Sequence, residues 1–216
     1  MAEPFENRVR QRGAAGPSEV SIAGLILAGG ASRRMGTAKA LLTIRGETFL
    51  DRLIRVISES CDPVVVVLGH EPEKIRAGLR TPSRAQFTIN HDYERGQLTS
   101  LQCGLRVVPA DSRAVLFTPV DYPTIQPETI RSLAAALQAG SNLFVVPRYE
   151  GRHGHPVIFN ASVLPEFLAL PPDSDARAVI HRHRDHTRYL DIEDPGILKD
   201  VDRPEEYAEL LKTSEQ

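Results

Sequence analysis

Short apolar runs alternate along this chain with segments that are apolar on one side only. The runs at residues 22–27, 64–68 and 114–118 have almost no polar interruption. Continuous apolarity of this kind is typical of strands that are buried on both faces of a parallel sheet. Residues 47–60 instead repeat apolar side chains at helical spacing, which predicts an amphipathic helix. Its apolar residues are Phe49, Leu50, Leu53, Ile54 and Ile57.

The alternation continues to the end of the chain. The pattern predicts further strands at residues 86–90, 143–147, 157–159 and 189–192. It predicts helices at 71–79, after the polar loop 90–101, at 126–139, twice within 161–184, and at 204–211. Strands that alternate with helices form a mostly parallel sheet covered by helices through right-handed crossovers. We therefore predict an α/β fold with one domain at residues 20–216, preceded by a polar tail at residues 1–19.

Composition narrows the class of protein. The chain has 216 residues and a formal net charge of −2, so nothing points to nucleic acid or to a membrane surface as a partner. Its 2 cysteines are too few for a disulfide framework or a metal cluster. No apolar run approaches membrane-spanning length, and residues 1–19 lack the apolar core of a signal peptide. We expect a cytoplasmic protein.

The most informative stretch is residues 25–42, where a buried strand runs into a glycine pair and then into basic residues. Gly29 and Gly30 let a backbone approach a ligand and point N–H groups at it, because no Cβ atom blocks the way. Arg33, Arg34 and Lys39 follow closely and suit a ligand with several negative charges. The pattern predicts a phosphate cradle between a strand and a helix. Neither the Walker motif nor the dinucleotide fingerprint is present.

Candidate chemistry also follows other strands, whose carboxyl ends collect ligands in open α/β sheets. Asp121, between Pro119 and Pro123, suits a Mg²⁺ ligand, with a turn-capping role as the alternative. Asp200 and Asp202 precede the last helix, and from the sequence alone an N-cap is favoured over a metal ligand. His155 is either a contact for a substrate phosphate or a loop histidine.

Three other histidines, at positions 181, 183 and 186, are spaced like a metal-binding group. They alternate with arginines, which favours a solvated helix end over a metal site. The sequence offers no Ser-His-Asp or Cys-His nucleophile. None is required if the attacking group is an anionic phosphate of the substrate.

Residues 27–39 match the spacing L-A-G-G-x-S-x-R-M-G-x-x-K, and three further blocks lie at 90–101, 121–123 and 200–206. In these blocks, which span about residues 22–211, the chain resembles the MobA/MocA-like nucleotidyltransferases. Gly154-His155-Pro156-Val157 also resembles an element of the cytidylyl branch. The resemblance implies a single Rossmann-like domain of three layers. It also implies Mg²⁺-dependent transfer of CMP or GMP from an NTP to the terminal phosphate of molybdopterin, with release of pyrophosphate.

The resemblance also implies roles for individual residues. Arg34 and Lys39 would act on the triphosphate, and Asp121 and Asp202 would hold Mg²⁺. His155 would contact the acceptor. The nucleotide would be bound by Leu27, Ala28, Gly29, Gly30, Asn90, Asp92, Thr99 and Ser100. A molybdoenzyme apoprotein is left open as a further partner.

The chain departs from the family pattern at two positions, with Tyr122 in place of the common Met and Arg203 in place of the common Thr. Neither change removes a charge that the mechanism needs, but both could reshape the acceptor pocket. Base choice is mixed: residues 27–30 resemble the guanylyl branch, whereas 98–101 and 154–157 resemble the cytidylyl branch. We expect CTP on two blocks against one. Two alternatives are an enzyme that acts on a sugar phosphate or another small phosphorylated acceptor, and a non-catalytic nucleotide or cofactor carrier.

Overall fold

The first strand carries side chains into two separate hydrophobic cores. A computed structural model of the chain describes residues 21–214. In strand β1 (Ile22–Ala28), Ile22 and Ile26 belong to one core, while Leu25 and Leu27 belong to the other. Successive side chains of a strand point to opposite faces of its sheet. Both faces are therefore covered, which is why the run is apolar without alternation.

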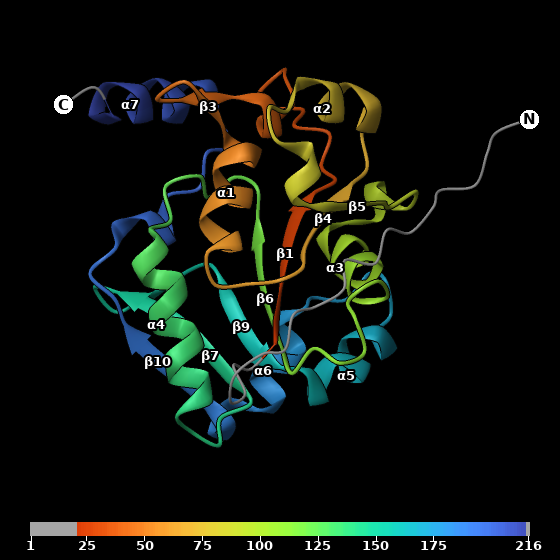
Figure 1. Ribbon diagram of the computed structural model, residues 1–216, viewed down its shortest axis with the longest axis vertical. Helices are drawn as coiled ribbons and strands as arrows, with labels where there is room; N and C mark the ends of the chain where they lie inside the picture. The colour runs from red at the N-terminus through yellow and green to blue at the C-terminus, as the bar shows by residue number, and fades with distance from the viewer. Residues whose placement is uncertain (1–20, 215–216) are drawn as a thin grey trace, which may run out of the picture.

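Ten strands and seven α-helices make up the described part of the chain (Figure 1). The strands are β1, β2 (Thr43–Ile44), β3 (Glu47–Thr48), β4 (Val64–Leu68), β5 (Gln86–Ile89), β6 (Ala114–Pro119), β7 (Phe144–Tyr149), β8 (Arg152–His153), β9 (Val157–Asn160) and β10 (Thr187–Asp191). The helices are α1 (Phe49–Ser58), α2 (Pro72–Gly78), α3 (Gln97–Leu105), α4 (Pro127–Gln138), α5 (Leu164–Ala169), α6 (Arg177–Arg182) and α7 (Pro204–Ser214).

One sheet of eight strands runs through the molecule in the order β10-β7-β9-β6-β1-β4-β5, with β8 beside β7. The neighbouring pairs β6–β1, β1–β4 and β4–β5 are parallel, and β10 is parallel to β7. Strand β9 is antiparallel to both β6 and β7. The prediction of a mostly parallel sheet is confirmed.

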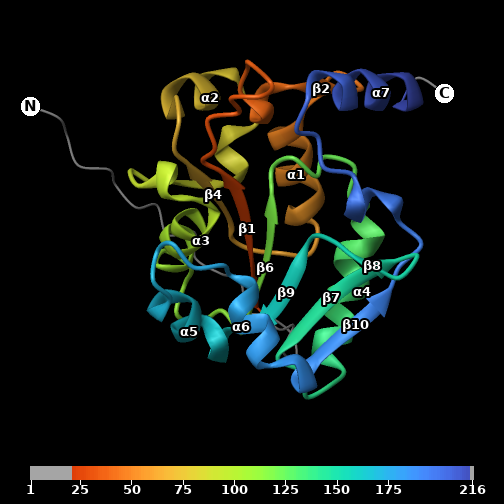
Figure 2. The same cartoon turned by 180° about the vertical axis from the view of Figure 1, so that it is seen from behind.

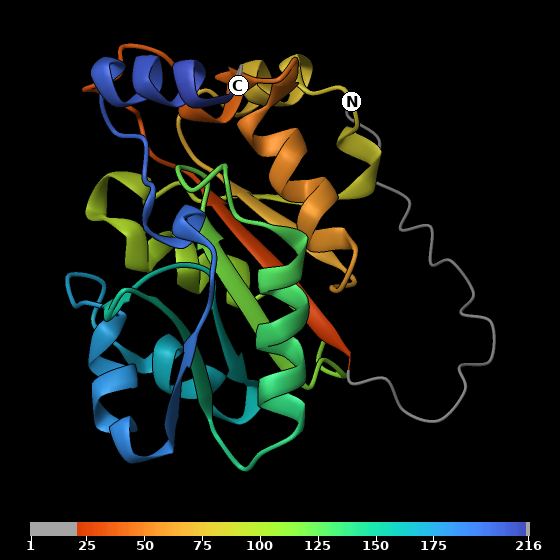
Figure 3. The same cartoon turned by 90° about the vertical axis from the view of Figure 1, so that its left-hand side faces the viewer.

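Helices cover both faces of this sheet. Seen from the side, α1 and α4 lie on one face, and α3, α5 and α6 lie on the other (Figure 3). The first core lies under α1 and α4, and the second lies under α3, α5 and α6. Helix α7 lies with α2 and the β2–β3 hairpin beyond the end of β1, as the view from behind also shows (Figure 2). The three-layer, Rossmann-like α/β fold is confirmed.

Each predicted strand and helix is present within a few residues of its predicted bounds. The structure adds two short strand pairs, β2–β3 and β7–β8, in regions predicted as turns. The direction of β9 was also not foreseen. Only residues 150–156 lie between β7 and β9, and a parallel neighbour needs a connection of a dozen residues or more. The predicted tail at residues 1–19 lies outside the described residues.

The loops that carry the predicted chemistry follow the carboxyl ends of parallel strands. Strands β1, β4 and β6 run in the same direction, so the segments that leave them meet at one edge of the sheet. Within residues 21–214, no helix is long and apolar enough to cross a membrane.

Candidate active site

A pocket of about 360 Å³ opens where β1 and β6 end. Three segments that are distant in the sequence line it: the glycine loop after β1, the start of α3, and the loop after β6. Its lining residues are Leu27, Gly29, Gly30, Ser32, Lys39, Tyr93, Gly96, Gln97, Ser100, Pro119, Val120 and Asp121. We call this the smaller pocket.

A lysine and two carboxylates meet at the smaller pocket. Lys39 Nζ lies 3.1 Å from Asp121 Oδ2 and forms a second, close contact with Asp202. Arg34 Nη1 lies 2.9 Å from the other oxygen of Asp202. Residues from the glycine loop, the end of β6 and the segment before α7 are thus held in one cluster, as the sequence predicts.

The pKa values of the two carboxylates are shifted in opposite directions. Burial raises the pKa of Asp121, and the nearby charge of Lys39 only partly opposes this rise. The hydrogen bond from Lys39 is the main reason that the pKa of Asp202 is lowered. Burial by itself lowers the pKa of Lys39, but the charge of Asp121 and the hydrogen bonds to both carboxylates outweigh burial and raise that pKa. Lys39 is therefore protonated at neutral pH.

A backbone hydrogen bond brings the C-terminal segment to the site. The N–H of Val201 donates to the carbonyl of Asp121 over 2.9 Å, which places Asp202 beside the loop after β6. The carboxylate that accepts backbone N–H groups at the start of α7 belongs to Glu206, with bonds of 2.6 Å from Asp202 and 2.9 Å from Arg203. The Asp202 side chain is turned toward Lys39 and Arg34 instead. The interpretation of Asp202 as a helix cap, which the sequence favoured, does not fit this geometry.

The glycine loop packs closely on helix α3. A Cβ atom at Gly29 would lie 2.9 Å from Ser100 Oγ, so only glycine fits without displacing that side chain. A Cβ atom at Gly30 would meet no protein atom within 4 Å, which leaves its backbone open to a ligand. Ser32 Oγ accepts the backbone N–H of Lys39 over 3.2 Å and ties the two ends of the loop together. The loop therefore has the form of a cradle.

Two of the predicted nucleotide-binding side chains, Asn90 and Thr99, are buried and hold other residues of the site by hydrogen bonds. Asn90 Nδ2 donates to Thr99 Oγ1 and Ser100 Oγ over 2.9 and 3.0 Å, and Asn90 Oδ1 accepts the N–H of Asp92. Asn90 and Thr99 are 5% and 7% exposed. Of this group Ser100 lines the smaller pocket, whereas Asn90, Asp92 and Thr99 do not. Their contact with base or ribose stays a prediction.

The donor set at the smaller pocket fits a magnesium ion that also binds phosphate oxygens. Asp121 Oδ1 is buried and has no hydrogen-bond partner, so one carboxylate oxygen is available. Mg²⁺ commonly takes one or two protein carboxylates and completes its shell with substrate phosphate and water. No group of three or more His, Cys, Asp or Glu side chains within residues 21–214 is arranged to hold a metal by itself.

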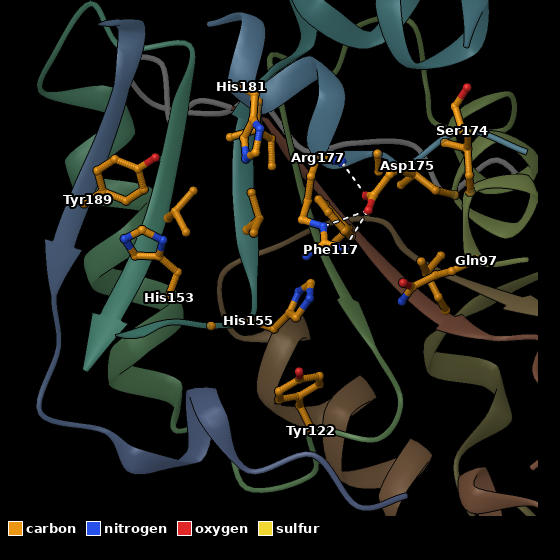
Figure 4. Close-up of a pocket in the computed structure, with 18 of the residues that line it drawn as sticks. Gln97, Phe117, Tyr122, His153, His155, Ser174, Asp175, Arg177, His181 and Tyr189 are labelled. Atoms are coloured by element: carbon orange, nitrogen blue, oxygen red, sulfur yellow. Dashed lines mark hydrogen bonds and ion pairs between the residues drawn. The ribbon is translucent and has the colours of Figure 1, made fainter. Parts of the chain in front are cut away.

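Figure 4 shows a larger pocket of about 780 Å³. It adjoins the smaller one, because Leu27 and Gln97 line both. Its wall combines apolar and aromatic side chains with polar ones, among them the charged Asp173, Asp175 and Arg177. Besides the two shared residues it is lined by Leu98, Leu101, Phe117, Tyr122, Val146, His153, Gly154, His155, Val157, Asp173, Ser174, Asp175, Ala176, Arg177, Ile180, His181 and Tyr189. His155, predicted to contact the acceptor, lies in this wall.

His155 is a neutral group in this wall. Its ring lies 4.9 Å from the ring of Tyr122 and 5.7 Å from that of Phe117. Burial lowers the pKa of His155 to about 4, and its Nδ1 atom is buried without a hydrogen-bond partner. Burial also raises the pKa of Tyr122 to about 12. Both residues are uncharged at neutral pH, so a contact of His155 with a phosphate would be a hydrogen bond and not an ion pair.

The three histidines at positions 181, 183 and 186 have different surroundings in the structure. His183 Nε2 lies 2.6 Å from Glu166 Oε1, His181 lines the larger pocket, and His186 is exposed. Sequence reasoning missed Gln97, His153, Arg177 and Tyr189 as pocket residues. Tyr189 carried a usable signal, because it is an aromatic residue in a predicted strand. The others became visible only when the fold brought their loops together.

An α/β sheet with a glycine cradle, a lysine and two carboxylates at its carboxyl edge is suited to binding a nucleoside triphosphate. The family model of the MobA-like NTP transferase domain matches residues 24–187, and the chain belongs to this family.

Three curated relatives show how the likeness is distributed. The molybdenum cofactor cytidylyltransferase of Escherichia coli is 26% identical over 183 residues, which are 85% of this chain and 92% of that protein. The purine catabolism protein PucB of Bacillus subtilis is 30% identical over 195 residues, with 85% and 93% covered. A probable molybdenum cofactor guanylyltransferase of Bacillus cytotoxicus is 26% identical over 197 residues, with 88% and 96% covered.

Solved structures share the fold of this chain. Rv0371c from Mycobacterium tuberculosis superposes with a TM-score of 0.80 at 29% identity and covers 90% of this chain and 99% of its own. A second structure of that protein, in complex with manganese, gives a TM-score of 0.76 at 26% identity and covers 89% and 99%.

Proposed function

We propose that this protein transfers a CMP moiety, or alternatively GMP, from an NTP to the terminal phosphate of molybdopterin and releases pyrophosphate. The observation that carries the proposal is the junction of the two pockets. Lys39 and Asp121 line the smaller pocket, and Lys39 also contacts Asp202. The larger pocket shares Leu27 and Gln97 with the smaller one. A triphosphate in one pocket and a phosphorylated acceptor in the other would meet at this junction.

The smaller pocket is assigned to the nucleotide. The open backbone at Gly30 and the cationic side chains of Lys39 and Arg34 suit a triphosphate, because fixed donors and charges stabilise phosphate oxygens without reorganisation. Asp121 and Asp202 would hold Mg²⁺. An ion held there would supply positive charge that offsets the negative charge of the phosphates and of the departing pyrophosphate.

The transfer itself needs no covalent intermediate on the protein. A terminal phosphate oxygen of the acceptor attacks the α-phosphorus of the NTP, a new P–O bond forms, and the bond to pyrophosphate breaks. The acceptor phosphate is already anionic at neutral pH, so no general base is required. Catalysis then depends on holding the two substrates in line and on neutralising charge. The neutral pair His155 and Tyr122 would border the acceptor without adding a charge of its own.

Relatives support this choice of reaction. The names of two of the three relatives describe cytidylyl and guanylyl transfer to molybdenum cofactor. The manganese complex of Rv0371c supports a divalent ion in this fold. We favour CTP on the resemblance of residues 98–101 and 154–157 to the cytidylyl branch. The cytoplasmic location, and delivery of the product to a molybdoenzyme apoprotein, stay part of the proposal.

Pyrophosphate release tests the proposal directly. The protein is incubated with Mg²⁺ and molybdopterin, and CTP and GTP are supplied separately. Release with CTP alone is the expected result, whereas release with GTP alone would retain the reaction and reverse the base. If pyrophosphate is released with a sugar phosphate and not with molybdopterin, molybdopterin is not the acceptor. Nucleotide binding without release from any acceptor would favour the carrier function.

A further inference from the structure

Two aromatic rings stack on each other in the wall of the larger pocket. His153 in β8 and Tyr189 in β10 have ring centroids 4.2 Å apart, and their planes differ by 11°. Both strands pair with β7, where His153 lies opposite Arg148 and Tyr189 lies opposite Val146. Positions 146 and 148 are two residues apart and share a face of the strand. The two rings therefore stack across β7, on the face that borders the pocket.

This pair is not a buried core contact. Tyr189 is 38% exposed, and His153 is exposed as well. Among the described residues, Ile89 and Val107 are the other large hydrophobic side chains with comparable exposure, and they line neither pocket. The stacked pair thus presents aromatic surface to a cavity rather than to bulk solvent alone. Such a surface suits a planar ring system, because flat rings stack on aromatic side chains.

The pair lies far from the junction of the two pockets. Figure 4 shows His153 and Tyr189 at one side of the larger pocket and Gln97 at the other, with His155 between them. An acceptor whose phosphate lies at Gln97 would extend past His155 toward the stacked rings. The pocket volume of about 780 Å³ is in the range that encloses a ligand of this size.

We propose that His153 and Tyr189 form a stacking platform for the planar heterocycle of the acceptor, and so determine acceptor specificity. The proposal rests on the proposed function and refines it, because it assigns the two ends of the acceptor to two ends of one pocket. A sugar phosphate carries no flat ring and would gain little from the platform. These residues therefore favour a heteroaromatic acceptor over a sugar phosphate.

Substitution of Tyr189 tests the platform. Tyr189→Leu removes the ring and should raise the KM for molybdopterin about tenfold, the change expected for loss of one stacking contact. The kcat and the KM for the nucleotide should stay at wild-type values. Tyr189→Phe keeps the ring and should behave as wild type. Tyr149→Leu makes the same exchange on β7, outside both pockets, and serves as the matched control.

Binding of a free pterin that lacks any phosphate provides a second readout. Its fluorescence should be quenched by the wild-type protein and by Tyr189→Phe, and much less by Tyr189→Leu. If Tyr189→Leu keeps the wild-type KM for molybdopterin and still binds the pterin, the platform is disproved while the transfer reaction stands. If Tyr149→Leu loses acceptor affinity equally, the pair serves the sheet and not the ligand. If Tyr189→Phe does so, the hydroxyl group and not the ring face is the contact, and the platform is disproved. If the wild-type protein rejects molybdopterin and pterin but uses a sugar phosphate, the proposed function fails together with the platform.

Discussion

The two pockets differ in what their walls are made of. The smaller pocket is bordered by a glycine loop and by a lysine between two carboxylates. The wall of the larger pocket holds several aromatic rings, and two of them, His155 and Tyr122, are uncharged at neutral pH. The Lys39 cluster therefore lies where a triphosphate would lie, and ring surface is concentrated where the acceptor would extend.

This difference indicates that the two pockets have different roles, one in the transfer reaction and the other in the choice of acceptor. Motifs shared with the family lie mainly around the smaller pocket, in the loops after β1 and β6. The larger pocket contains Tyr122, which departs from the common pattern, and the stacked pair of His153 and Tyr189. The chemistry of transfer would thus be general to the family, and the choice of acceptor would belong to this chain. The following predictions separate effects on chemistry from effects on the fold.

The largest effect is expected at Asp121. Asp121→Asn removes a charge but keeps the shape of the side chain, so turnover should fall by about three orders of magnitude, as for loss of one preorganised electrostatic group. Thermal stability should change little. Pyrophosphate release and a melting curve measure the two effects, and Asp185→Asn, an exposed site outside both pockets, is the control. Wild-type release by Asp121→Asn would disprove the assignment of this site.

A smaller effect is expected at Lys39. Lys39→Met keeps the aliphatic length and removes the ammonium group, so kcat/KM for the nucleotide should fall about a hundredfold. The KM for the acceptor should stay unchanged, because the lysine borders the smaller pocket only. Steady-state kinetics with each substrate varied in turn measure this difference. The same exchange at the exposed Lys74 should have no effect. An equal rise in both KM values would contradict the division between the two pockets.

Asp51 is a contrasting carboxylate, because it serves the fold and not the site. It is 2% exposed and accepts hydrogen bonds from Thr48 Oγ1 at 2.7 Å and from the N–H groups of Arg80 and Thr81 at 3.1 Å. Asp51→Ala should lower the free energy of unfolding by about 2 kcal/mol because buried donors lose their acceptor. At 25 °C the folded variant should keep the wild-type kcat. Chemical denaturation and pyrophosphate release measure the two effects, and a loss of kcat without a loss of stability would contradict this role.

Asp51 also gives a pH dependence with a defined sign. Burial by itself raises its pKa, but the hydrogen bonds from Thr48, Arg80 and Thr81 outweigh burial and hold the pKa below the usual 3.8. The unfolded chain therefore binds this proton more readily than the folded one. The contribution of Asp51 to stability is complete above pH 3.8 and is lost as the pH falls through the lower, folded pKa. In acid denaturation, Asp51→Ala should show a weaker loss of stability than wild type over this range.

Much of the fold could be predicted because local signals agree with it. Continuous apolar runs predicted β1, β4 and β6, and helical spacing predicted α1 and α4. The antiparallel direction of β9 was missed because an apolar run has no direction. Its seven-residue connection to β7 did hold the information, since it is too short for a crossover.

The site could be predicted less completely. The glycine loop, Lys39 and Asp121 stood out because each lies directly after a buried strand or within a spaced motif. The position of Asp202 depends on a backbone bond between Val201 and Asp121, which no local pattern encodes. His153 and Tyr189 meet only because β8 and β10 flank the same strand. Contacts across strands depend on register, and register is not visible in a single segment.

The contact between Lys39 and Asp202 has a consequence for the lifetime of the protein. These residues are 163 positions apart, so a nucleotide held by both would fasten the loop after the first strand to the segment before the last helix. A ligand that binds the folded chain and not the unfolded one stabilises the fold by about 2.7 kcal/mol at a hundred times its Kd. Proteases that attack opened chains would then degrade the protein about a hundredfold more slowly when nucleotide is abundant. The substrate supply of the cell would thereby set how long each copy of the enzyme survives.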